Sequence, residues 1–461
     1  MYLLQMSELD QLKPIQKNNF NRMTLVKTKS EELLERRSNV VANGVGVFNT
    51  ATVREAKGAI IIDEDGRELI DFAGGIGVVN AGHCPEPVVK AIQEQAAKYI
   101  HTSFNVVTYE PYIKLCEELA EILPHGEKTK AMLVSTGAEA VENAIKIARQ
   151  ATGKQGVLCF TGAFHGRTMM AMTLTSKINY KTGCGPFAPE VYRLPFPNFY
   201  RYSEAKDMDE FVKNELHRLH ESSYNLVQPE NLAAIILEPV QGEGGFNVVP
   251  PKYLEGLREY CTKHNIMLIL DEIQSGFART GKWAAWQHYN VKPDISTYAK
   301  SLGSGMPISA ILGRAEVMDA AAPGTIGGTY IGNPLSCVAA SATIQFMKDE
   351  NLNERGTEVG NIIRERFLRI MGECSEVGDV RGLGAMVAIE FVKNGDPKKP
   401  NAEICSEVIK GCAERGLVLL SAGTFKNVIR VLAPLVITND QLNQGLDILE
   451  SEIKKASAKT I

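Results

Sequence analysis

Between about residue 85 and residue 310, short apolar runs alternate with longer stretches in which apolar positions recur every three or four residues. The short runs are typical of strands buried on both faces, and we expect such strands at 131–134, 156–160, 233–237, 266–270 and 295–299. The periodic stretches predict helices at 86–99, 109–122, 139–150, 208–219 and 252–264. Strands that alternate with helices predict an α/β fold, in which a mostly parallel sheet is flanked by helices.

Both ends of the chain depart from this pattern. Residues 1 to about 30 show no clear periodicity and predict an N-terminal arm, after which residues 30–37 predict a helix start capped by Ser30. Two strands joined by a turn are expected at 59–62 and 68–72. After about residue 340, a long helical stretch followed by further strands and a helix predicts a smaller α+β unit.

Composition narrows the class of protein. A chain of 461 residues is long for one core, so we expect two domains, or one large domain with a smaller one. Lys and Arg number 50 and Asp and Glu 54, a near balance that favours neither nucleic acid nor a membrane surface as a partner. The sequence has no run of 18 apolar residues and no secretory signal pattern at its start. Nine cysteines without a C-x-x-C pair are typical of reduced thiols, so we expect a cytoplasmic protein.

Three strand ends carry the candidate chemistry. The run at 266–270 ends in Asp271, and the run at 295–299 is followed by Lys300 and a Gly-rich turn. Each residue taken alone has an ordinary interpretation, since an acid can cap the next element and a lysine can extend its amine to water. The run at 131–134 is followed by STGA and a helix, whose first N–H groups form an anion site. Together, an amine, a carboxylate and a phosphate site describe a binding site for pyridoxal phosphate (PLP).

The sequence gives less support to nucleotide-binding and metal-binding sites. The dinucleotide and P-loop fingerprints are absent from the sequence. His217 and His220 could place two imidazoles on one helix face as metal ligands, but no third ligand is suggested nearby. A solvated helix face is the better interpretation, and we expect no metal site.

Seven motifs make the chain resemble the class III, fold-type-I PLP aminotransferases over about residues 35–449. They are DFAGGI at 71–76, STGAEAVENA at 135–144, GAFHGRT at 162–168, EPVQGEGG at 238–245, LDEIQSG at 270–276, AKS at 299–301 and GTYIGNP at 328–334. The resemblance implies an arm at 1–30, a segment at 31–78 that packs with the small domain, a large PLP-binding domain at 79–343 and a C-terminal small domain at 344–461. It also implies a homodimer or a dimer of dimers, with sites at the subunit interface.

The resemblance assigns roles to individual residues. Lys300 is expected to form the Schiff base and then to transfer the substrate's proton, and Asp271 is expected to pair with the pyridinium nitrogen. The residues expected to bind PLP are Gly137, Ala138, Phe164, Asp271, Ile273, Gln274, Lys300 and, from a second subunit, Thr329. The residues expected to bind substrate are Ile76, Asn105, Arg167, Glu243 and Arg430.

The resemblance also implies a substrate class, through two arginines that match positions of the family. Arg167 is expected to hold the carboxylate far from the reacting amine, and Arg430 the α-carboxylate of glutamate or 2-oxoglutarate. An ω-amino acid such as 4-aminobutyrate has no α-carboxylate, so Glu243 is expected to neutralise Arg430 in that half-reaction. The implied reaction is a ping-pong transfer from 4-aminobutyrate to 2-oxoglutarate, which gives succinic semialdehyde and L-glutamate.

Three positions depart from the commonest pattern of this family, and rival functions stay open. Ala138 stands where many relatives have Ser, Phe164 replaces a frequent Tyr, and Asn105 stands where Gln is common. The nearest rivals are aminotransferases for 5-aminovalerate, ornithine or acetylornithine. A PLP aminomutase would not need the Glu243–Arg430 pair, and a non-catalytic interaction protein would not need the strand-end lysine and acid.

Overall fold

The computed structural model describes residues 27–459, and the chain divides into two units, Met1–Gly46 and Val47–Ile461. In the first unit, helix α1 (Lys29–Val40) begins after Thr28, whose side chain accepts a hydrogen bond from the Glu31 N–H. The Glu31 side chain in turn accepts from the Thr28 N–H. This reciprocal capping box requires the glutamate at the third helical position, so the prediction of Ser30 as the cap is wrong. The arm predicted at 1–30 lies almost wholly outside the described residues.

A seven-stranded sheet forms the centre of the second unit. Its strands are β4 (Thr129–Val134), β5 (Gly156–Phe160), β6 (Val191–Leu194), β7 (Leu232–Leu237), β8 (Met267–Asp271), β9 (Ile295–Tyr298) and β10 (Ser309–Arg314). They lie in the order β4-β10-β9-β8-β7-β5-β6, and β10 runs antiparallel to both of its neighbours. The pairings of β9, β8, β7, β5 and β6 are all parallel. The predicted mostly parallel sheet is therefore confirmed.

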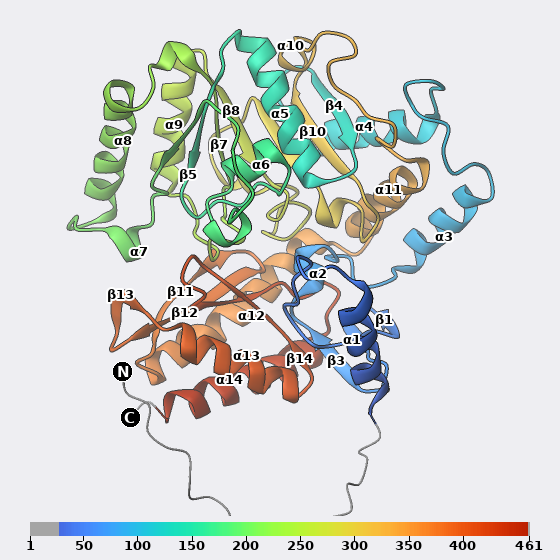
Figure 1. Ribbon diagram of the computed structural model, residues 1–461, viewed down its shortest axis with the longest axis vertical. Coiled ribbons are helices and arrows are strands. Elements are labelled where there is room, and N and C mark those ends of the chain that lie inside the picture. Colours follow the sequence, from blue (N-terminus) through green and yellow to red (C-terminus); the bar gives the residue numbers. More distant parts are fainter. Residues whose placement is uncertain (1–26, 460–461) are drawn as a thin grey trace, which may run out of the picture. The chain divides into compact units, whose positions relative to one another are not determined.

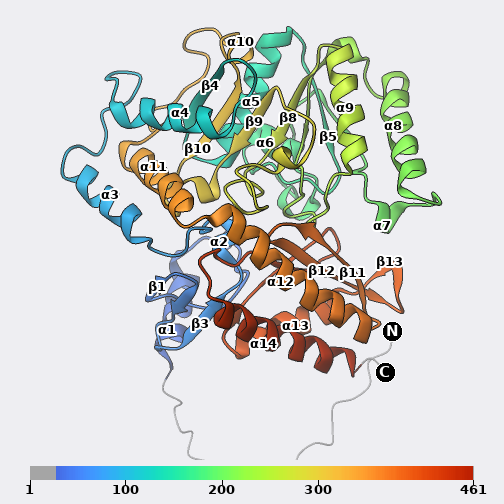
Figure 2. The same cartoon turned by 180° about the vertical axis from the view of Figure 1, so that it is seen from behind.

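Successive residues of the central strands face two different apolar cores. Leu268 and Leu270 of β8 belong to one cluster, whereas Met267 and Ile269 belong to the other. The helices that cover the sheet are α4 (Glu110–Ile122), α5 (Gly137–Thr152) and α9 (Pro251–Lys263). Helix α5 contributes to the second cluster, and α4 and α9 contribute to the first, on the other face of the sheet (Figures 1 and 2). Burial on both faces explains the unbroken apolar runs in the sequence.

Two smaller sheets complete the second unit. Their strands are β1 (Glu55–Lys57), β2 (Ile60–Ile62), β3 (Glu68–Asp71), β11 (Val377–Leu383), β12 (Met386–Lys393), β13 (Asp396–Pro400), β14 (Leu417–Val418), β15 (Leu420–Ala422) and β16 (Val428–Val431). One sheet has the order β11-β12-β16-β15, with β13 paired to β12, and the other has the order β1-β2-β3-β14. Because β14 pairs in parallel with β3, segments from both ends of the chain share one sheet. The domain boundaries expected at residues 78 and 343 stay predictions.

The other helices connect these sheets or cover their faces. They are α2 (Gly74–Gly77), α3 (Glu86–Ala96), α6 (Met169–Leu174), α7 (Phe199–Tyr202), α8 (Met208–Asn225), α10 (Ala315–Met318), α11 (Pro334–Asp349), α12 (Leu352–Glu373), α13 (Ala402–Glu414) and α14 (Asn439–Ser457). Short 3-10 turns include η1 (Ile178–Tyr180) and η4 (Lys300–Leu302), which both carry residues of the site below. Within residues 27–459, no helix combines the length and apolar character needed to cross a membrane.

Candidate active site

Three elements meet at one edge of the large sheet. Asp271 is the last residue of β8, Lys300 lies two residues beyond the end of β9, and α5 begins shortly after β4. These elements share a cavity of about 440 Å³. The predicted residues that line this cavity are Gly137, Ala138, Phe164, Glu243, Asp271, Ile273, Gln274 and Lys300. The structure thus brings together residues that are up to 163 positions apart in the chain, from 137 to 300.

Lys300 has an unusual backbone conformation, and its side chain has no partner in the described part of the chain. Its φ of 49° places a non-glycine residue in the left-handed region, which persists only where the surrounding structure enforces it. Among residues 27–459, no hydrogen-bond or ion-pair partner of its amine is found within bonding distance. Burial lowers the pKa of Lys300 to about 8, a shift that nearby Glu243 opposes and Arg430 reinforces. A fraction of the amine is therefore neutral, and nucleophilic, near neutral pH.

Asp271 is buried, with 3% of its surface exposed, and is held on both carboxylate oxygens. Its Oδ2 lies 2.7 Å from Nδ1 of His165. Its Oδ1 accepts a hydrogen bond from the Ile273 N–H at 3.1 Å and another from the Thr297 hydroxyl at 3.2 Å. These contacts fix the direction of a carboxylate at the cavity wall, where it can meet a protonated ring nitrogen.

The start of α5 offers an anion site. Thr136 caps the helix, and Glu139 accepts the backbone N–H groups of Ser135 and Thr136 at 2.9 Å each. In the described part of the chain, this leaves the N–H groups of Gly137 and Ala138 without a partner at the positive end of the helix dipole. A Cβ at residue 137 would lie 2.9 Å from the Ile273 side chain, so glycine is what keeps this approach open.

These groups fit PLP. The cavity holds an unpaired amine, an oriented carboxylate and free N–H groups at a helix end, which match the aldehyde, the pyridine nitrogen and the phosphate of that cofactor. Oε1 of Gln274 is also buried without a hydrogen-bond partner in residues 27–459, and its amide borders the same cavity. An orphaned polar group of this kind indicates a missing ligand.

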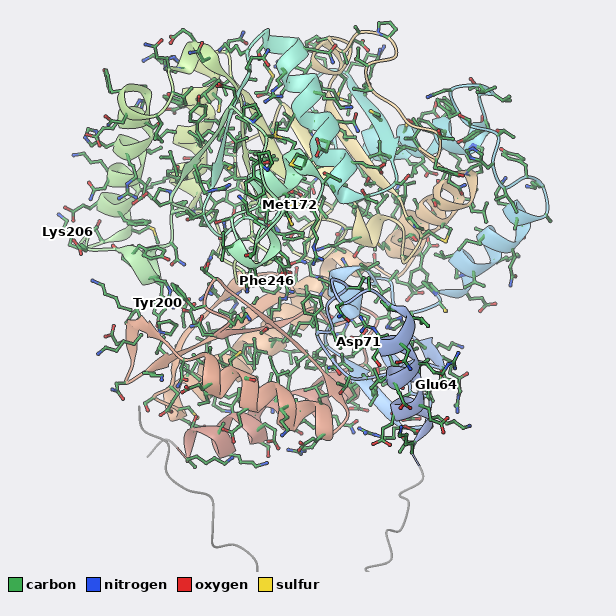
Figure 3. The ribbon with its side chains drawn as sticks, viewed as in Figure 1. Glu64, Asp71, Met172, Tyr200, Lys206 and Phe246 are labelled. Carbon is green, nitrogen blue, oxygen red and sulfur yellow. The ribbon has the colours of Figure 1, made fainter. Side chains whose placement is uncertain are left out.

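Ile76 lies in a strained turn beside the cofactor cavity. Residues 74–77 all have positive φ, and a φ of 69° is a clear outlier for a β-branched residue such as Ile76. Asp71, labelled in Figure 3, secures the turn because its Oδ1 accepts the N–H groups of Ala73 and Gly74 at 2.8 Å each. A Cβ at residue 74 would lie 2.3 Å from the carbonyl oxygen of Leu432, so only glycine fits there.

The turn opens into a larger cavity of about 740 Å³, which also contains both predicted substrate arginines. Arg430 is 4% exposed, and its Nη1 lies 2.6 Å from Oε1 of Glu243. Burial opposes ionisation of Glu243, but Arg430 and then Lys300 outweigh it and hold the pKa of Glu243 below its usual value. Nε of Arg430 is buried and has no hydrogen-bond partner in the described residues, so the guanidinium retains a free donor.

Arg167 differs from Arg430 because the described residues offer it no acidic partner. It is exposed at the edge of the 740 Å³ cavity. Within residues 27–459, no carboxylate lies within salt-bridge distance of its guanidinium. An exposed, uncompensated guanidinium beside a cavity can bind the carboxylate of a ligand with two parallel hydrogen bonds.

Two predicted residues lie elsewhere. Thr329 is exposed and does not line either cavity of its own chain. Asn105 is exposed as well, and it lies near Gly327 in a different hollow. The role of Thr329 in the partner's site and the substrate contact of Asn105 stay predictions.

Sequence reasoning assigned no role to several residues that the structure places in the site. His165 orients Asp271, and Tyr180 and Lys177 line the larger cavity. Glu238 is buried, and its two oxygens accept the N–H groups of Phe164 at 3.0 Å and Gly242 at 2.9 Å. Burial raises the pKa of Glu238 to about 7. His165 and Glu238 belong to the quoted motifs, and that was the only signal that could have found them.

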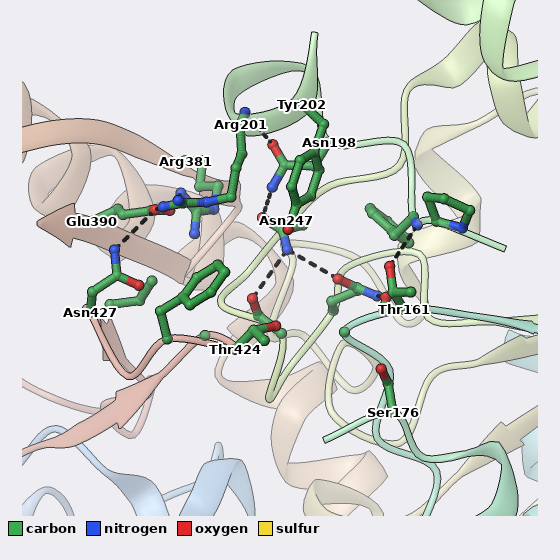
Figure 4. A pocket seen from close by; sticks show the side chains of 18 of the residues that line it. Thr161, Ser176, Asn198, Arg201, Tyr202, Asn247, Arg381, Glu390, Thr424 and Asn427 are labelled. Atoms are coloured by element: carbon green, nitrogen blue, oxygen red, sulfur yellow. Dashed lines mark hydrogen bonds and ion pairs between the residues drawn. The ribbon is translucent and has the colours of Figure 1, made fainter. Parts of the chain in front are cut away.

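A third cavity, of about 510 Å³, is lined by Gly244 and Asn247, which follow Glu243 in the chain, and by Arg201, Arg381 and Glu390 (Figure 4). Its wall contains a buried ionic cluster in which Glu390 pairs with both Arg201 and Arg381. Nε of Arg381 donates to the Gly245 carbonyl at 2.8 Å, and the Gly423 N–H donates to the Glu243 carbonyl at 3.0 Å. Arg381 of the cluster and the backbone of Gly423 therefore both hold the backbone of the loop that carries Glu243.

The fold and the site together define a class of protein, and the comparison with known families agrees. The family profile described as Aminotransferase class-III matches residues 40–453, and the chain belongs to this family. Class III aminotransferases depend on PLP, so the predicted cofactor is confirmed.

Individual relatives match over nearly their whole length. The chain is 45% identical to a probable 4-aminobutyrate aminotransferase of Bacillus subtilis, over 91% of this chain and 97% of the relative. It is 46% identical to a 5-aminovalerate aminotransferase of Pseudomonas aeruginosa, with the same shares covered. The solved structure of a PLP-bound amine transaminase from an uncultivated Pseudomonas species is similar with a TM-score of 0.82 and 29% identity, over 89% of this chain and 95% of that one.

Proposed function

We propose that the protein transfers the amino group of an ω-amino acid, foremost 4-aminobutyrate, to 2-oxoglutarate, giving succinic semialdehyde and L-glutamate. One observation carries the proposal: the buried Glu243–Arg430 pair lines the same cavity as the amine of Lys300 and as Arg167, which has no acidic partner within residues 27–459. Similarity to a probable 4-aminobutyrate aminotransferase supports the choice of donor.

The arginines explain how one cavity accepts two kinds of substrate. A monocarboxylate needs a single cation, which Arg167 supplies, while Glu243 neutralises Arg430 at 2.6 Å. A dicarboxylate needs both cations, so Arg430 exchanges Glu243 for the second carboxylate. A buried guanidinium left without any partner would cost about 3–5 kcal/mol. The exchange keeps Arg430 paired in both half-reactions.

The remaining residues bind the cofactor and move the proton. PLP, when bound, supplies the electron sink for the bond that breaks at the amino-bearing carbon. The free N–H groups at the start of α5 would hold the phosphate, Asp271 would hold a proton on the pyridine nitrogen, and Gln274 would bind the phenolic oxygen. Phe164 and Ile273, which line the same cavity, would enclose the ring. Lys300, once displaced by substrate, would carry the proton away from the amino-bearing carbon.

A second candidate donor is 5-aminovalerate, because the chain is also similar to a 5-aminovalerate aminotransferase. The two donors differ by one methylene, which is worth about 1–3 kcal/mol in a pocket. We expect both to react, with 4-aminobutyrate the better by about 10- to 100-fold in kcat/KM. The measurement is a set of single-turnover reactions of the holoenzyme, in which the loss of cofactor absorbance is followed. Comparing 4-aminobutyrate, 5-aminovalerate, ornithine and acetylornithine in this way ranks the four donors by kcat/KM. A faster reaction with any other donor would overturn the assignment of 4-aminobutyrate.

We further propose that the active unit is a homodimer or a multiple of one. Thr329 is exposed, although the family resemblance gives it a contact with phosphate, and its neighbour Tyr330 is 66% exposed. Ile100 is 60% exposed on the same surface, where the adjacent His101 ring lies 4.9 Å from that of Tyr330. Light scattering of the holoenzyme is expected to give the mass of a dimer or tetramer. A fully active monomer would contradict a site shared between subunits.

The cysteines bear on the proposed location in the cytoplasm. All nine are free, and Cys159, Cys261 and Cys337 are among those that are buried. Free thiols are typical of proteins in a reducing compartment. A cytoplasmic enzyme is the proposal that these cysteines support.

A further inference from the structure

Tyr180, at the end of η1, contacts two groups of the proposed substrate site, namely Arg167 and the Glu243 partner of Arg430. Its hydroxyl donates a hydrogen bond to Oε2 of Glu243 at 3.2 Å. The guanidinium carbon of Arg167 lies 4.6 Å from the centre of its ring. The ring also meets Phe164 edge to face, with centroids 5.1 Å apart and an interplanar angle of 71°. One half-buried side chain therefore contacts a substrate arginine, the acid of the exchange pair and a residue of the cofactor cavity.

The ring accounts for the position of Arg167. No carboxylate of residues 27–459 pairs with this guanidinium, so the contact with Tyr180 is the interaction that the structure provides for its charge. A cation over an aromatic face is stabilised by the ring quadrupole. A guanidinium held in this way keeps its N–H donors for a carboxylate, which an ion pair would consume.

The hydroxyl accounts for the position of Glu243. The two oxygens of this carboxylate have different partners, because Oε1 lies against Arg430 and Oε2 accepts from Tyr180. If Arg430 leaves for a substrate carboxylate, the hydrogen bond from Tyr180 can remain. The other cations that face Glu243 are Lys177 and Lys300, from the segment before η1 and from η4. Among residues 27–459, Tyr180 is the side chain whose hydroxyl donates to this carboxylate.

We propose that Tyr180 is a positioning residue for both substrate carboxylates. Its hydroxyl holds Glu243 in place while Arg430 exchanges partners, and its ring fixes Arg167 for the carboxylate common to both substrates. This inference rests on the proposed function, because it assigns the two parts of one side chain to the two carboxylate sites of that function.

Two variants separate the two roles. Tyr180→Phe keeps the ring and removes the hydroxyl, so Glu243 loses a donor that matters most when Arg430 is away. We expect kcat/KM for glutamate and 2-oxoglutarate to fall about tenfold relative to that for 4-aminobutyrate, the effect of one hydrogen bond to a charged group. Tyr180→Leu also removes the ring, so we expect KM to rise about 3- to 30-fold for both substrates, with a smaller change in kcat.

The measurement is single-turnover kinetics of both half-reactions, with PLP-loaded enzyme for 4-aminobutyrate and glutamate and with enzyme carrying the aminated cofactor for 2-oxoglutarate. Tyr224→Phe removes a hydroxyl from an 88% exposed tyrosine on α8 and is expected to leave both half-reactions unchanged. Cofactor absorbance and thermal unfolding of each variant establish that the fold and PLP content are intact. An unchanged ratio between the half-reactions in Tyr180→Phe, or an equal loss in both, would overturn the proposal.

The outcome also separates this proposal from the proposed function. If wild-type enzyme carries out neither half-reaction with any ω-amino donor, the proposed function fails whatever the variants do. If wild-type enzyme carries out both and Tyr180→Phe keeps their ratio, only the role of Tyr180 fails.

Discussion

Replacing Lys300 by alanine is expected to abolish transamination while leaving a protein that still binds PLP. The substitution removes the amine that would hold the cofactor and move the substrate's proton. Loss of a positioned acid–base group alone costs about 10²- to 10⁴-fold in rate, so we expect at least that loss in kcat. PLP binding is expected to survive because the start of α5, Asp271 and Gln274 supply separate contacts. Steady-state activity and the absorbance of dialysed enzyme measure the two effects.

The attachment site of the cofactor gives an independent test. Borohydride treatment of wild-type holoenzyme is expected to fix PLP on the peptide that contains Lys300. Lys177, which lines the adjacent larger cavity, is the competing amine, and Lys213→Ala on the exposed face of α8 is a control that should change nothing. Because burial lowers the pKa of Lys300 to about 8, attachment of PLP to the apoenzyme should become faster as the pH rises through 8. A label on any other lysine would refute the assignment.

The large sheet could be predicted because its strands are buried on both faces. The runs that form β5, β7 and β8 consist of apolar residues without interruption, and each appears in the structure within one residue of its predicted bounds. β6 and β10 were not predicted. β6 is an edge strand whose first three residues are only partly buried. β10 runs antiparallel between β4 and β9, and its place depends on pairings that no local pattern reveals.

The candidate site also contains residues whose proximity could be predicted from the sequence and residues whose proximity could not. Asp271 and Lys300 follow predicted strands, and the carboxyl ends of parallel strands meet at one sheet edge, so their proximity follows from sequence and topology. Glu243 and Arg430 lie on a loop and on β16 of a different sheet, and only the family resemblance linked them. Tyr180 went unassigned because its contacts arise entirely from tertiary packing of a short 3-10 turn.

The exchange between Glu243 and Arg430 gives the second large expected effect. Glu243→Ala removes the partner of Arg430 when 4-aminobutyrate is bound, so the cavity then holds an unmatched buried cation. We expect kcat/KM for 4-aminobutyrate to fall relative to that for glutamate, whose α-carboxylate pairs with Arg430 directly. The expected difference is about 1–3 kcal/mol, or about 5- to 150-fold, the range for a hydrogen bond to a charged group partly replaced by water.

Arg430→Ala is expected to shift the substrate preference in the direction opposite to Glu243→Ala. It removes the cation that the second carboxylate needs, so glutamate and 2-oxoglutarate should lose far more kcat/KM than 4-aminobutyrate, which depends on Arg167. Single-turnover spectra of both half-reactions in both variants give four ratios of kcat/KM, each comparing a variant with the wild-type enzyme. Glu221→Ala, which removes an exposed acid paired with His217 on α8, is the matched control and should leave them unchanged. If each variant loses the two half-reactions in equal proportion, the Glu243–Arg430 pair is structural and the exchange does not occur.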